Sequence, residues 1–475
     1  MSRAGVRRAL DEAPLSIFHL KAAVTAGAGF FTDSYDLNVI GAVMLLVKPE
    51  FRLNAGQVAL VTSSTLLAVA VGAILFGRLG DLLGRRRVYG LEAVIMILGA
   101  LLSAFAPNFT WLVIARIILG IGIGGDYPAS GVIMAEFANR RNRGKLVGLT
   151  FLFYVLGQVT GYLVALVVLA VGTPSDIAWR VILGLGALPS LVVLWNRRHM
   201  PESPRWTLDR GDPRQAAEDL RTFSGREIAE TAAETAPGTS AETPPLAGAT
   251  GRGRPGILGD RTFLITLIGT AGSWFFFNVA VYGNSVSQPL LIASIAPNTS
   301  NLTNIAVNTV LVVCFSLTAA IIGLAVLDRM PRKHLQILGF GLSATSMLLI
   351  AAIPGLTTTV GPFALIFGVS LFGIALGPNY TTMLLAAESY PTRIRSTAHG
   401  LSAGIAKIGA FVGALVTPIA LAGLGLRATV LIAGICFLLG IATTLVLREP
   451  GELALDSKAD DPEPETEAAR AAVVV

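Results

Sequence analysis

Apolar runs of about twenty residues recur along most of this chain, and they constrain its fold more than any other feature. A helix needs about 20 consecutive apolar residues to cross the hydrocarbon core of a bilayer. Of the 475 residues only 14% are charged, whereas a soluble protein carries about 25% charged residues. The sequence therefore predicts an all-α integral membrane protein.

The apolar runs predict twelve membrane-spanning helices. We place them at 22–47, 57–79, 88–106, 110–137, 144–171, 177–197, 262–290, 303–327, 334–354, 360–389, 395–421 and 425–447. Basic clusters at 85–87 and 329–333 alternate with nearly uncharged loops at 107–110 and 354–359. Basic loops remain in the cytoplasm, so we expect both termini to be cytoplasmic and the protein to lie in the plasma membrane. The net charge of +6 belongs to these loops and does not indicate a nucleic-acid partner.

The two halves of the chain repeat one another. Glu136 and Gly157 match Glu388 and Gly409 at one constant spacing, and an Arg-X-Arg pair follows each glutamate at the same distance. The repeat predicts two pseudo-symmetric six-helix bundles, at 22–197 and 261–447, with a substrate site at their interface. Matching Phe30-Phe31 with Phe275-Phe276 places Asp33 opposite Asn278 in this repeat.

Three segments lie outside the predicted bundles. Residues 1–21 form a cytoplasmic N-terminal segment, and 198–260 form a central loop that is rich in Ala, Thr, Glu and Pro. The tail at 448–475 is acidic. Such compositions bury too little apolar surface to fold, so we expect the central loop and the tail to be largely disordered. No signal peptide is apparent, and both cysteines lie in apolar runs, which indicates neither disulfide nor thiolate metal site.

Several ionisable residues lie within these apolar runs. A charge at the bilayer centre costs about 2.5–3.5 kcal/mol on insertion scales, so its default interpretation is functional. Asp33 and Asp36 are three residues apart on one helix face, and their repulsion favours one of them holding a proton. Asp126 lies in a glycine-rich run. The alternative for each acid is a static ion pair or a helix cap.

The run from Gly77 to Arg87 resembles the signature loop of the major facilitator superfamily. Within that superfamily, Gly124-Gly125-Asp126-Tyr127-Pro128 is similar to the fingerprint of the phosphate:proton symporters. The resemblance implies two rocking bundles around a central anion site. It implies substrate-binding roles for Tyr127, Gln158, Trp274, Asn379 and Lys407, and proton-coupling roles for Asp33, Asp36 and Asp126, with Glu92 and Arg116 as further candidates.

One position departs from the family pattern. The phosphate symporters typically carry an aspartate four residues after the tryptophan, where this chain has Asn278. An amide does not titrate, so a proton cycle has to use Asp33, Asp36 or Asp126. We include Asn278 among the substrate-binding candidates because its position relative to Trp274 is retained.

The residue chemistry supports this site independently of the resemblance. Hydroxyl, amide and indole groups donate the hydrogen bonds that replace the water around an oxyanion, and Lys407 adds a positive charge. Trp274, Asn278 and Tyr282 share one helical stripe, and Tyr154, Gln158 and Tyr162 repeat that spacing. The alternative is that these residues mark the membrane interface or bond neighbouring helices.

Other charges lie at the cytoplasmic ends of spans, where we expect ion pairs between the bundles that hold the inner gate shut. The gating candidates are Asp81, Arg85, Arg86, Glu136, Arg143, Glu388 and Arg395. The sequence contains no catalytic, metal-ligand or cofactor motif, so we expect neither an enzyme nor a cofactor. Our prediction is a monomeric, proton-coupled symporter for inorganic phosphate or a similar oxyanion, with membrane lipids as its surroundings. The alternatives are a symporter for a carboxylate or aromatic acid and a non-transporting nutrient sensor.

Overall fold

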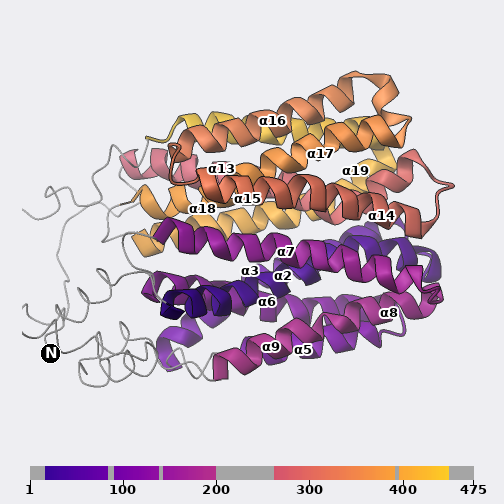
Figure 1. The fold of residues 1–475 in the computed structure, drawn as a ribbon, viewed down its shortest axis with the longest axis horizontal. Coiled ribbons are helices and arrows are strands. Elements are labelled where there is room, and N and C mark those ends of the chain that lie inside the picture. The colour runs from indigo at the N-terminus through magenta and orange to yellow at the C-terminus, as the bar shows by residue number, and fades with distance from the viewer. Residues whose placement is uncertain (1–16, 84–89, 138–142, 199–260, 391–394, 449–475) are drawn as a thin grey trace, which may run out of the picture.

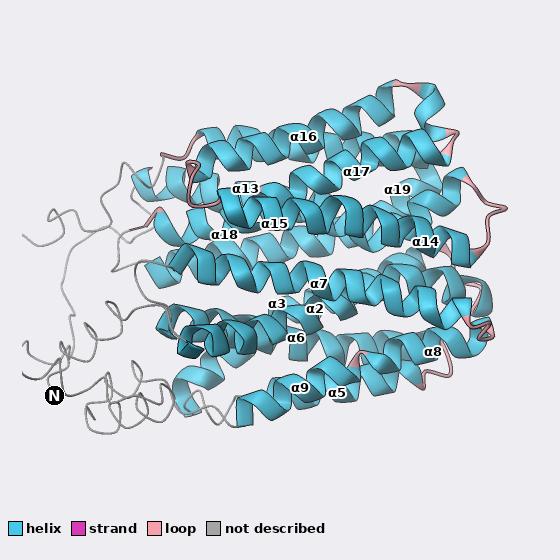
Figure 2. Cartoon of the chain, in the orientation of Figure 1, coloured by secondary structure: helices cyan, strands magenta, loops and turns pink. Residues whose placement is uncertain are grey.

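The computed structural model describes the backbone of residues 17–83, 90–137, 143–198, 261–390 and 395–448, with some side chains inside these ranges left out. Within them every regular element is a helix, and no strand occurs (Figure 2). The helices lie side by side along the long axis, with the N-terminal half below the C-terminal half (Figure 1).

The N-terminal half contains six spans. Its helices are α2 (Ile17–Glu50), α3 (Ala55–Leu83), α5 (Leu91–Ala104), α6 (Phe109–Phe137), α7 (Arg143–Ala170), α8 (Ser175–Leu185) and α9 (Ala187–Arg198). The last two together form one span, over Ser175–Arg198. Helix α2 begins at Ile17 and therefore extends into the predicted N-terminal segment, 1–21.

The C-terminal half also contains six spans, two of which are interrupted helices. Its elements are α13 (Arg261–Ile295), α14 (Asn301–Leu311), the π-helical η2 (Val312–Leu317), α15 (Thr318–Val326), α16 (Arg332–Ala352), the short 3-10 turn η3 (Pro354–Thr357), α17 (Val360–Leu376), α18 (Pro378–Glu388) and α19 (Arg395–Leu445). Helices α14 and α15 continue one another through η2, and α17 and α18 also share one span.

Ten of these helices or helix pairs are long and apolar enough to cross a membrane. The shorter α5 is a further apolar helix, and α19 divides into two spans at Gly425, whose φ of 79° is not helical. Only glycine adopts such a φ without strain. The described chain thus matches the predicted twelve-helix fold. The predicted disorder of 198–260 and 448–475 concerns residues outside the described ranges.

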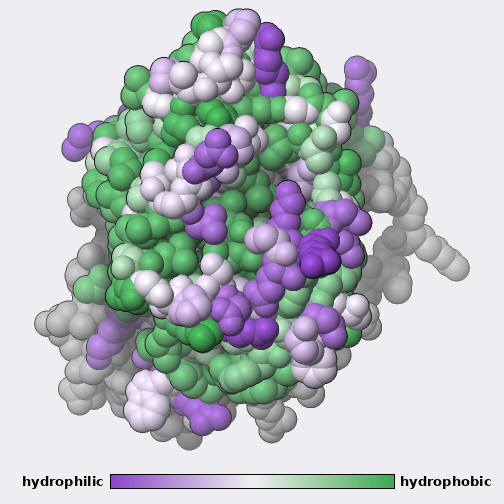
Figure 3. All heavy atoms as spheres, turned by 90° about the vertical axis from the view of Figure 1, so that its right-hand side faces the viewer, coloured by the Kyte–Doolittle hydropathy of each residue, from purple (hydrophilic) through white to green (hydrophobic). Residues whose placement is uncertain are grey.

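Two ends of the bundle are distinguished below. We call the end that carries Ile17 and Arg448 the terminal face, and the opposite end, with the loops near 51–54, 105–108, 171–174, 296–300 and 353–359, the hairpin face. Figure 3 looks onto the hairpin face, where hydrophilic side chains gather in the middle and toward the right, among many hydrophobic ones.

Local sequence signals set helix starts at the hairpin face. Before α3, the backbone N–H of Asn54 donates to Gln57 Oε1 and the backbone N–H of Gln57 donates to Asn54 Oδ1, both at 2.9 Å. This reciprocal pair is a capping box. Ser300 caps α14 by accepting from the backbone N–H of Thr303 at 3.1 Å. These caps satisfy N–H groups that the first helical turn leaves without partners.

The pseudo-symmetry of the two halves is visible in a pair of arginines. Arg180 of α8 donates to the carbonyl oxygen of Ala104, at the end of α5, at 3.2 Å. Arg427, at the corresponding place in α19, donates to the carbonyl oxygen of Ala351, at the end of α16, at 3.0 Å. Each cation satisfies carbonyl groups that a helix C-terminus leaves open and complements the helix dipole there.

Glycines set the register of the repeat. A Cβ on Gly157 of α7 would meet the backbone of Phe31 in α2, and a Cβ on Gly409 of α19 would meet the backbone of Phe275 in α13. Phe31 therefore corresponds to Phe275 and not to Phe276. The pairing predicted from the aromatic residues is wrong by one position, because the close helix approach at the glycines, and not the aromatic pair, fixes the register.

The corrected register changes the counterpart of Asn278. With Phe31 opposite Phe275, the residue opposite Asn278 is Ser34, and Asp33 lies opposite Phe277. A second pair of glycines agrees, since Gly161 approaches the backbone of Tyr35 and Gly413 that of Val279. Asp33 therefore has no polar counterpart in α13.

The glycine contacts lead to a stability prediction. We expect Gly157→Leu to lower the free energy of unfolding by about 1–3 kcal/mol or more, because the new side chain overpacks a seam formed by backbone atoms. Thermal unfolding of the detergent-solubilised protein measures the change. Gly404→Leu is the control, since no atom lies within 4 Å of a Cβ there. Equal melting temperatures for the two variants would contradict this account of the seam.

Candidate functional site

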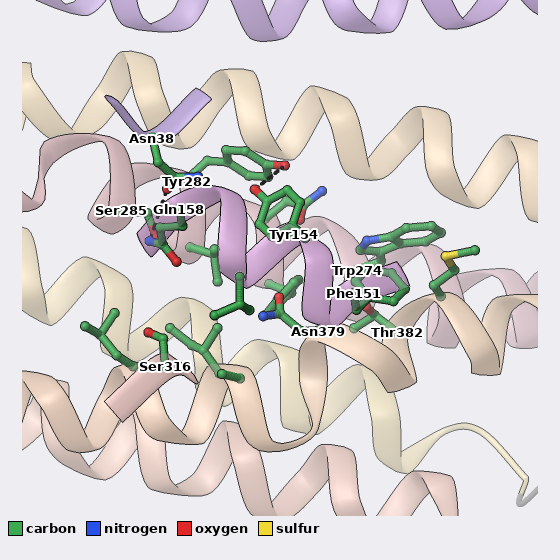
Figure 4. A pocket seen from close by; sticks show the side chains of 18 of the residues that line it. Asn38, Phe151, Tyr154, Gln158, Trp274, Tyr282, Ser285, Ser316, Asn379 and Thr382 are labelled. Atoms are coloured by element: carbon green, nitrogen blue, oxygen red, sulfur yellow. Dashed lines mark hydrogen bonds between the residues drawn. The ribbon is translucent and has the colours of Figure 1, made fainter. Parts of the chain in front are cut away.

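A cavity of about 60 Å³ lies between the two halves. Its walls come from α2 and α7 on one side and from α13, η2, α17, α18 and α19 on the other. Figure 4 shows amide, hydroxyl and indole groups pointing into this space from both halves. The cavity therefore occupies the interface at which the repeat predicted a site.

Five of the six predicted substrate-binding residues line this cavity. They are Gln158, Trp274, Asn278, Asn379 and Lys407. The sixth, Tyr127, lies in α6, but its side chain is outside the described residues. The structure brings these residues together from four helices, while their part in binding a substrate stays a prediction.

The predicted helical stripes are only partly reproduced. Trp274, Asn278 and Tyr282 all face the cavity from α13. On α7, Tyr154 and Gln158 line it, but Tyr162 is fully buried in the apolar core of the N-terminal half. The stripe on α7 is therefore one turn shorter than its spacing suggests, because the helix passes from the interface into its own bundle.

Hydrogen bonds hold two of the amides in place. Gln158 Nε2 donates to Asn38 Oδ1 at 3.2 Å, within the N-terminal half. Asn278 Nδ2 donates to the carbonyl oxygen of Ala406 at 2.8 Å, which joins α13 to α19 beside Lys407. A helix break places a third amide, because Gly377 ends α17 and Pro378 begins α18 with Asn379 in its first turn. Proline suits this first position because its missing N–H is not needed there.

Lys407 is the one cation among the described residues that line the cavity. Its side chain is buried, and the amine lies 5.7 Å from the centre of the Tyr282 ring. A cation at this distance from an aromatic face is attracted by the ring quadrupole. No acidic residue occurs among the described lining residues, so the cavity carries a positive formal charge.

The sequence analysis missed several lining residues. Asn38, Ser285, Ser316 and Thr382 add polar groups, and Phe151 adds an aromatic wall. Ser285 follows Tyr282 by three residues and Thr382 follows Asn379 by three residues, so each lies about one turn beyond a residue that the sequence analysis named. That spacing is a usable signal. Asn38 and Ser316 carry no such signal, because neither lies one turn from a named residue and small polar residues are common in packed membrane helices.

The three predicted proton-coupling acids are all buried, but they have different partners. Asp126 forms an ion pair with Arg197 of α9 and accepts a hydrogen bond from Ser130 at 3.0 Å. Arg197 also pairs with Glu92 of α5 at 2.5 Å. Asp126 therefore belongs to a buried network that joins α5, α6 and α9. The sequence analysis did not identify Arg197, which follows an apolar run like an ordinary basic flank.

Asp36 lies beside a second buried cation. Arg116 of α6 donates to the backbone carbonyl oxygen of Asp36 at 2.9 Å and to Thr65 Oγ1 at 3.2 Å. Its charge interacts with the Asp36 carboxylate, although neither carboxylate oxygen accepts a hydrogen bond. The two groups fix the packing of α2 against α6 and α3.

Asp33 is fully buried, and neither of its carboxylate oxygens has a hydrogen-bond partner. The charges that act on it belong to Asp126, Lys407, Arg197 and Asp36, in decreasing order of strength. Asp126 is close because it packs against Gly29, one turn before Asp33, where a Cβ would meet its carboxylate. The sequence predicts that Asp36 repels the Asp33 carboxylate, but Asp126 repels it more strongly than Asp36 does.

The buried charges do not balance when all of them are ionised. Among the described side chains, the buried Asp, Glu, Arg and Lys residues are four acids and three cations: Asp33, Asp36, Glu92 and Asp126 with Arg116, Arg197 and Lys407. One proton on one acid makes this set neutral. Because Asp36, Glu92 and Asp126 each lie beside an arginine, Asp33 is the acid whose charge is least compensated.

Contacts between the halves occur on both sides of the cavity. Toward the terminal face, the rings of Phe151 and Tyr380 meet edge to face with centroids 5.7 Å apart. Toward the hairpin face, Thr62 Oγ1 donates to the carbonyl oxygen of Ala414 at 3.3 Å, and Gly41 approaches the backbone of Val286. The Tyr154 hydroxyl also meets that of Tyr282 at 3.4 Å (Figure 4). The halves thus close on the cavity from both ends.

Of the predicted gating residues, the structure describes the side chain of Glu388. It pairs with Arg332 at 3.8 Å, and both residues belong to the C-terminal half at the terminal face. The side chains of the other candidates lie outside the described residues: Asp81, Arg85, Arg86, Glu136, Arg143 and Arg395. Ion pairing between the bundles therefore stays a prediction.

Two six-helix bundles around a buried polar cavity define a multi-pass membrane transporter of the major facilitator fold. The chain belongs to the sugar (and other) transporter family, whose model matches residues 21–450.

Three similar proteins extend this result. The chain is 32% identical to a probable inorganic phosphate transporter 1-6 of Arabidopsis thaliana, over 97% of each chain. It is 33% identical to a probable inorganic phosphate transporter 1-10 of Oryza sativa subsp. japonica, over 94% of this chain and 90% of the relative. It is 32% identical to a repressible high-affinity phosphate permease of Neurospora crassa, over 85% of this chain and 78% of the relative.

Solved structures support the fold. The xylose transporter XylE from E. coli, in a partially occluded inward open conformation, superimposes with a TM-score of 0.70 at 20% identity, covering 90% of this chain and 97% of XylE. The proton:xylose symporter XylE bound to 6-bromo-6-deoxy-D-glucose also gives 0.70, at 22% identity, covering 90% and 95%. The predicted major facilitator fold is confirmed.

The Arg197 network leads to a second stability prediction. Arg197→Gln leaves Glu92 and Asp126 buried without their cation, so we expect a loss of about 3–5 kcal/mol in the free energy of unfolding. Adding Glu92→Gln and Asp126→Asn to the same chain should restore most of the melting temperature. Arg198→Gln is the control, because Arg198 is exposed. A single variant as stable as the wild type would show that the network contributes no net stability.

Proposed function

We propose that this protein is a proton-coupled symporter that takes up inorganic phosphate, or a similar small oxyanion, by alternating access. The observation that carries the proposal is the central cavity, which combines amide, hydroxyl and indole donors with one buried lysine and has no described acidic wall. The relatives named as phosphate transporters support the choice of substrate.

The size of the cavity favours a small ion. A water molecule needs about 10–15 Å³ of such volume, so 60 Å³ holds a few waters. Phosphate, with one phosphorus and its oxygens, is of this size. The structural likeness to a xylose transporter, at 20–22% identity, concerns the fold alone.

The donors suit an oxyanion in number and in charge. Gln158 and Asn379 contribute amides from opposite halves, and Trp274 contributes an indole N–H, so a bound anion would join the two bundles. Lys407 supplies the positive charge. With Asn278 in place of an acid, no carboxylate from α13 competes with the anion for this lysine, which favours binding of a doubly charged anion as well as a singly charged one.

Asp33 is the proposed proton carrier. Its carboxylate has no hydrogen bond, interacts with Lys407 of the other half, and belongs to a buried set that is neutral with one added proton. Protonation of Asp33 frees the positive charge of Lys407 for the anion, and loss of the proton restores the attraction between the two side chains. Proton and anion therefore bind cooperatively, which is the requirement for symport.

We further propose the orientation and setting of the molecule. Arg329, Arg332 and Lys333 lie at the terminal face, and basic residues mark the cytoplasmic side of a membrane protein. The terminal face and both chain ends are thus cytoplasmic, and the hairpin face is on the extracellular side of the cell membrane. The protein acts as a monomer, because each chain contains a complete cavity.

A second candidate substrate is an aromatic or other organic acid. The aromatic side chains of Phe151, Trp274, Phe277 and Tyr282 form part of the cavity wall and favour a flat apolar group beside the anionic one. Competition separates the two candidates. Unlabelled phosphate should reduce uptake of labelled phosphate strongly, whereas benzoate and short carboxylates should not.

The proton-coupling proposal predicts a pH dependence. Proteoliposomes should take up labelled phosphate faster when the outside is acidic than when no pH difference exists, because Asp33 is loaded with its proton from outside. In Asp33→Asn the side chain is permanently neutral, so accumulation driven by the pH difference should disappear while exchange of internal for external phosphate remains. Uptake that is indifferent to pH in the wild type would remove the coupling claim.

The departure at Asn278 gives a substrate-affinity prediction. Asn278→Asp places a negative charge beside Lys407, and we expect the KM for phosphate at neutral pH to rise at least about tenfold through repulsion of the anion. The effect should shrink as the pH falls and the new acid is protonated. Asn278→Ala is the matched control, because it removes the amide without adding charge. A pH-independent rise that is equal in both variants would contradict the charge argument.

A further inference from the structure

A second, apolar cavity of about 400 Å³ lies on the outer surface between α14 and α17. Val307, Val310 and Leu311 line it from one face of α14, and Ala364 and Leu365 line it from α17. Val310 is 58% exposed and Leu365 is 61% exposed. Both helices are membrane spans, so this groove opens toward the hydrocarbon of the bilayer and not toward water.

The groove has the length of one membrane leaflet. It runs along α14 from Thr303, near the hairpin face, to Phe315, which is about 18 Å at 1.5 Å per residue. Half of the hydrocarbon core is about 15 Å thick. At the inner end the Phe315 ring packs over Gly368 of α17, where a Cβ would collide with it. The groove therefore begins at the membrane interface and ends near mid-membrane.

The inner end of the groove adjoins the central cavity. Phe315 and Ser316 are consecutive residues of the π-helical turn η2 (Val312–Leu317), and Phe315 lines the groove while Ser316 lines the central cavity. Val312 of the same turn is fully buried in the core cluster formed mainly by the N-terminal half. One turn thus contacts the groove, the cavity and the opposite bundle. Turns of this kind frequently occur at functional sites.

We propose that this groove binds one acyl chain of a phospholipid from the leaflet at the hairpin face, and that the bound chain supports the η2 turn during transport. The apolar lining selects hydrocarbon, because apart from the Thr303 hydroxyl, which bonds with Ser300, the lining residues present no polar side chain. The length and the closed inner end fit a single extended chain. Ser300 and Thr303 at the outer end lie where a lipid headgroup begins.

Photo-crosslinking of the full chain tests the binding. The protein is placed in liposomes of phosphatidylcholine that carries a diazirine near the end of one acyl chain, and labelled peptides are mapped by mass spectrometry after irradiation. Labelling should concentrate on Phe315, Val310 and Leu365. Ile321 of α15 is the reference, since it is 54% exposed on the same span but outside the groove. Labelling of Ile321 equal to that of the groove would overturn the proposal.

A groove-filling variant tests occupancy and its consequence. Val310→Trp should reduce labelling of Phe315 about tenfold, the change expected when about two buried methylenes lose their contacts. Ile321→Trp should leave it unchanged. Phosphate uptake should change in Val310→Trp and not in Ile321→Trp. The uptake measurement rests on the proposed function, whereas the crosslinking does not. If the wild type does not transport phosphate, the crosslinking still tests the lipid site.

If Val310→Trp is no longer labelled at Phe315 but takes up phosphate normally, the proposal that the bound chain supports the η2 turn is overturned.

Discussion

Charge buried inside the membrane span is the constraint on which the rest of the structure depends. Arg197 compensates Glu92 and Asp126 at once, and Arg116 lies beside Asp36. These groups tie α2, α5, α6 and α9 into one body. The cation that acts most strongly on Asp33 is Lys407 of the other half. The balance of the N-terminal bundle therefore depends on the position of the C-terminal bundle, and a change in one alters the charge state that the other favours.

The dependence of one bundle on the other is transmitted through helix contacts, within each bundle and between them. Gly157 holds α7 against α2 and Gly409 holds α19 against α13, so helices within each bundle pack at backbone distance. The contacts between the bundles include ring edges, single hydrogen bonds, the η2 turn and the approach of Gly41 to the backbone of Val286. The cavity lies where the two bundles meet, which is the arrangement that alternating access requires.

The sequence analysis predicted the spans, the twelve-helix fold and five residues of the cavity, because hydrophobic length and helical spacing are local properties. It did not predict Arg197, whose role depends on α9 packing against α5 and α6. It also misplaced the counterpart of Asn278, since the aromatic pairs suggest one register and the glycine contacts set another. Similarly, Tyr162 follows Gln158 at the spacing at which Gln158 follows Tyr154, but the packing of α7 directs the Tyr162 side chain into the apolar core. In each case the outcome depends on a contact between residues that are far apart in the sequence, which local patterns do not reveal.

The central claim is that Asp33 holds a proton that phosphate binding senses. Infrared difference spectroscopy of the membrane-reconstituted protein, with and without phosphate, measures this directly through the C=O stretch of a protonated carboxyl group. The account predicts a phosphate-sensitive band that is absent in Asp33→Asn and present in Asp126→Asn. A band that persists in Asp33→Asn and is lost in Asp126→Asn would contradict it, and would assign the proton to the Arg197 network instead.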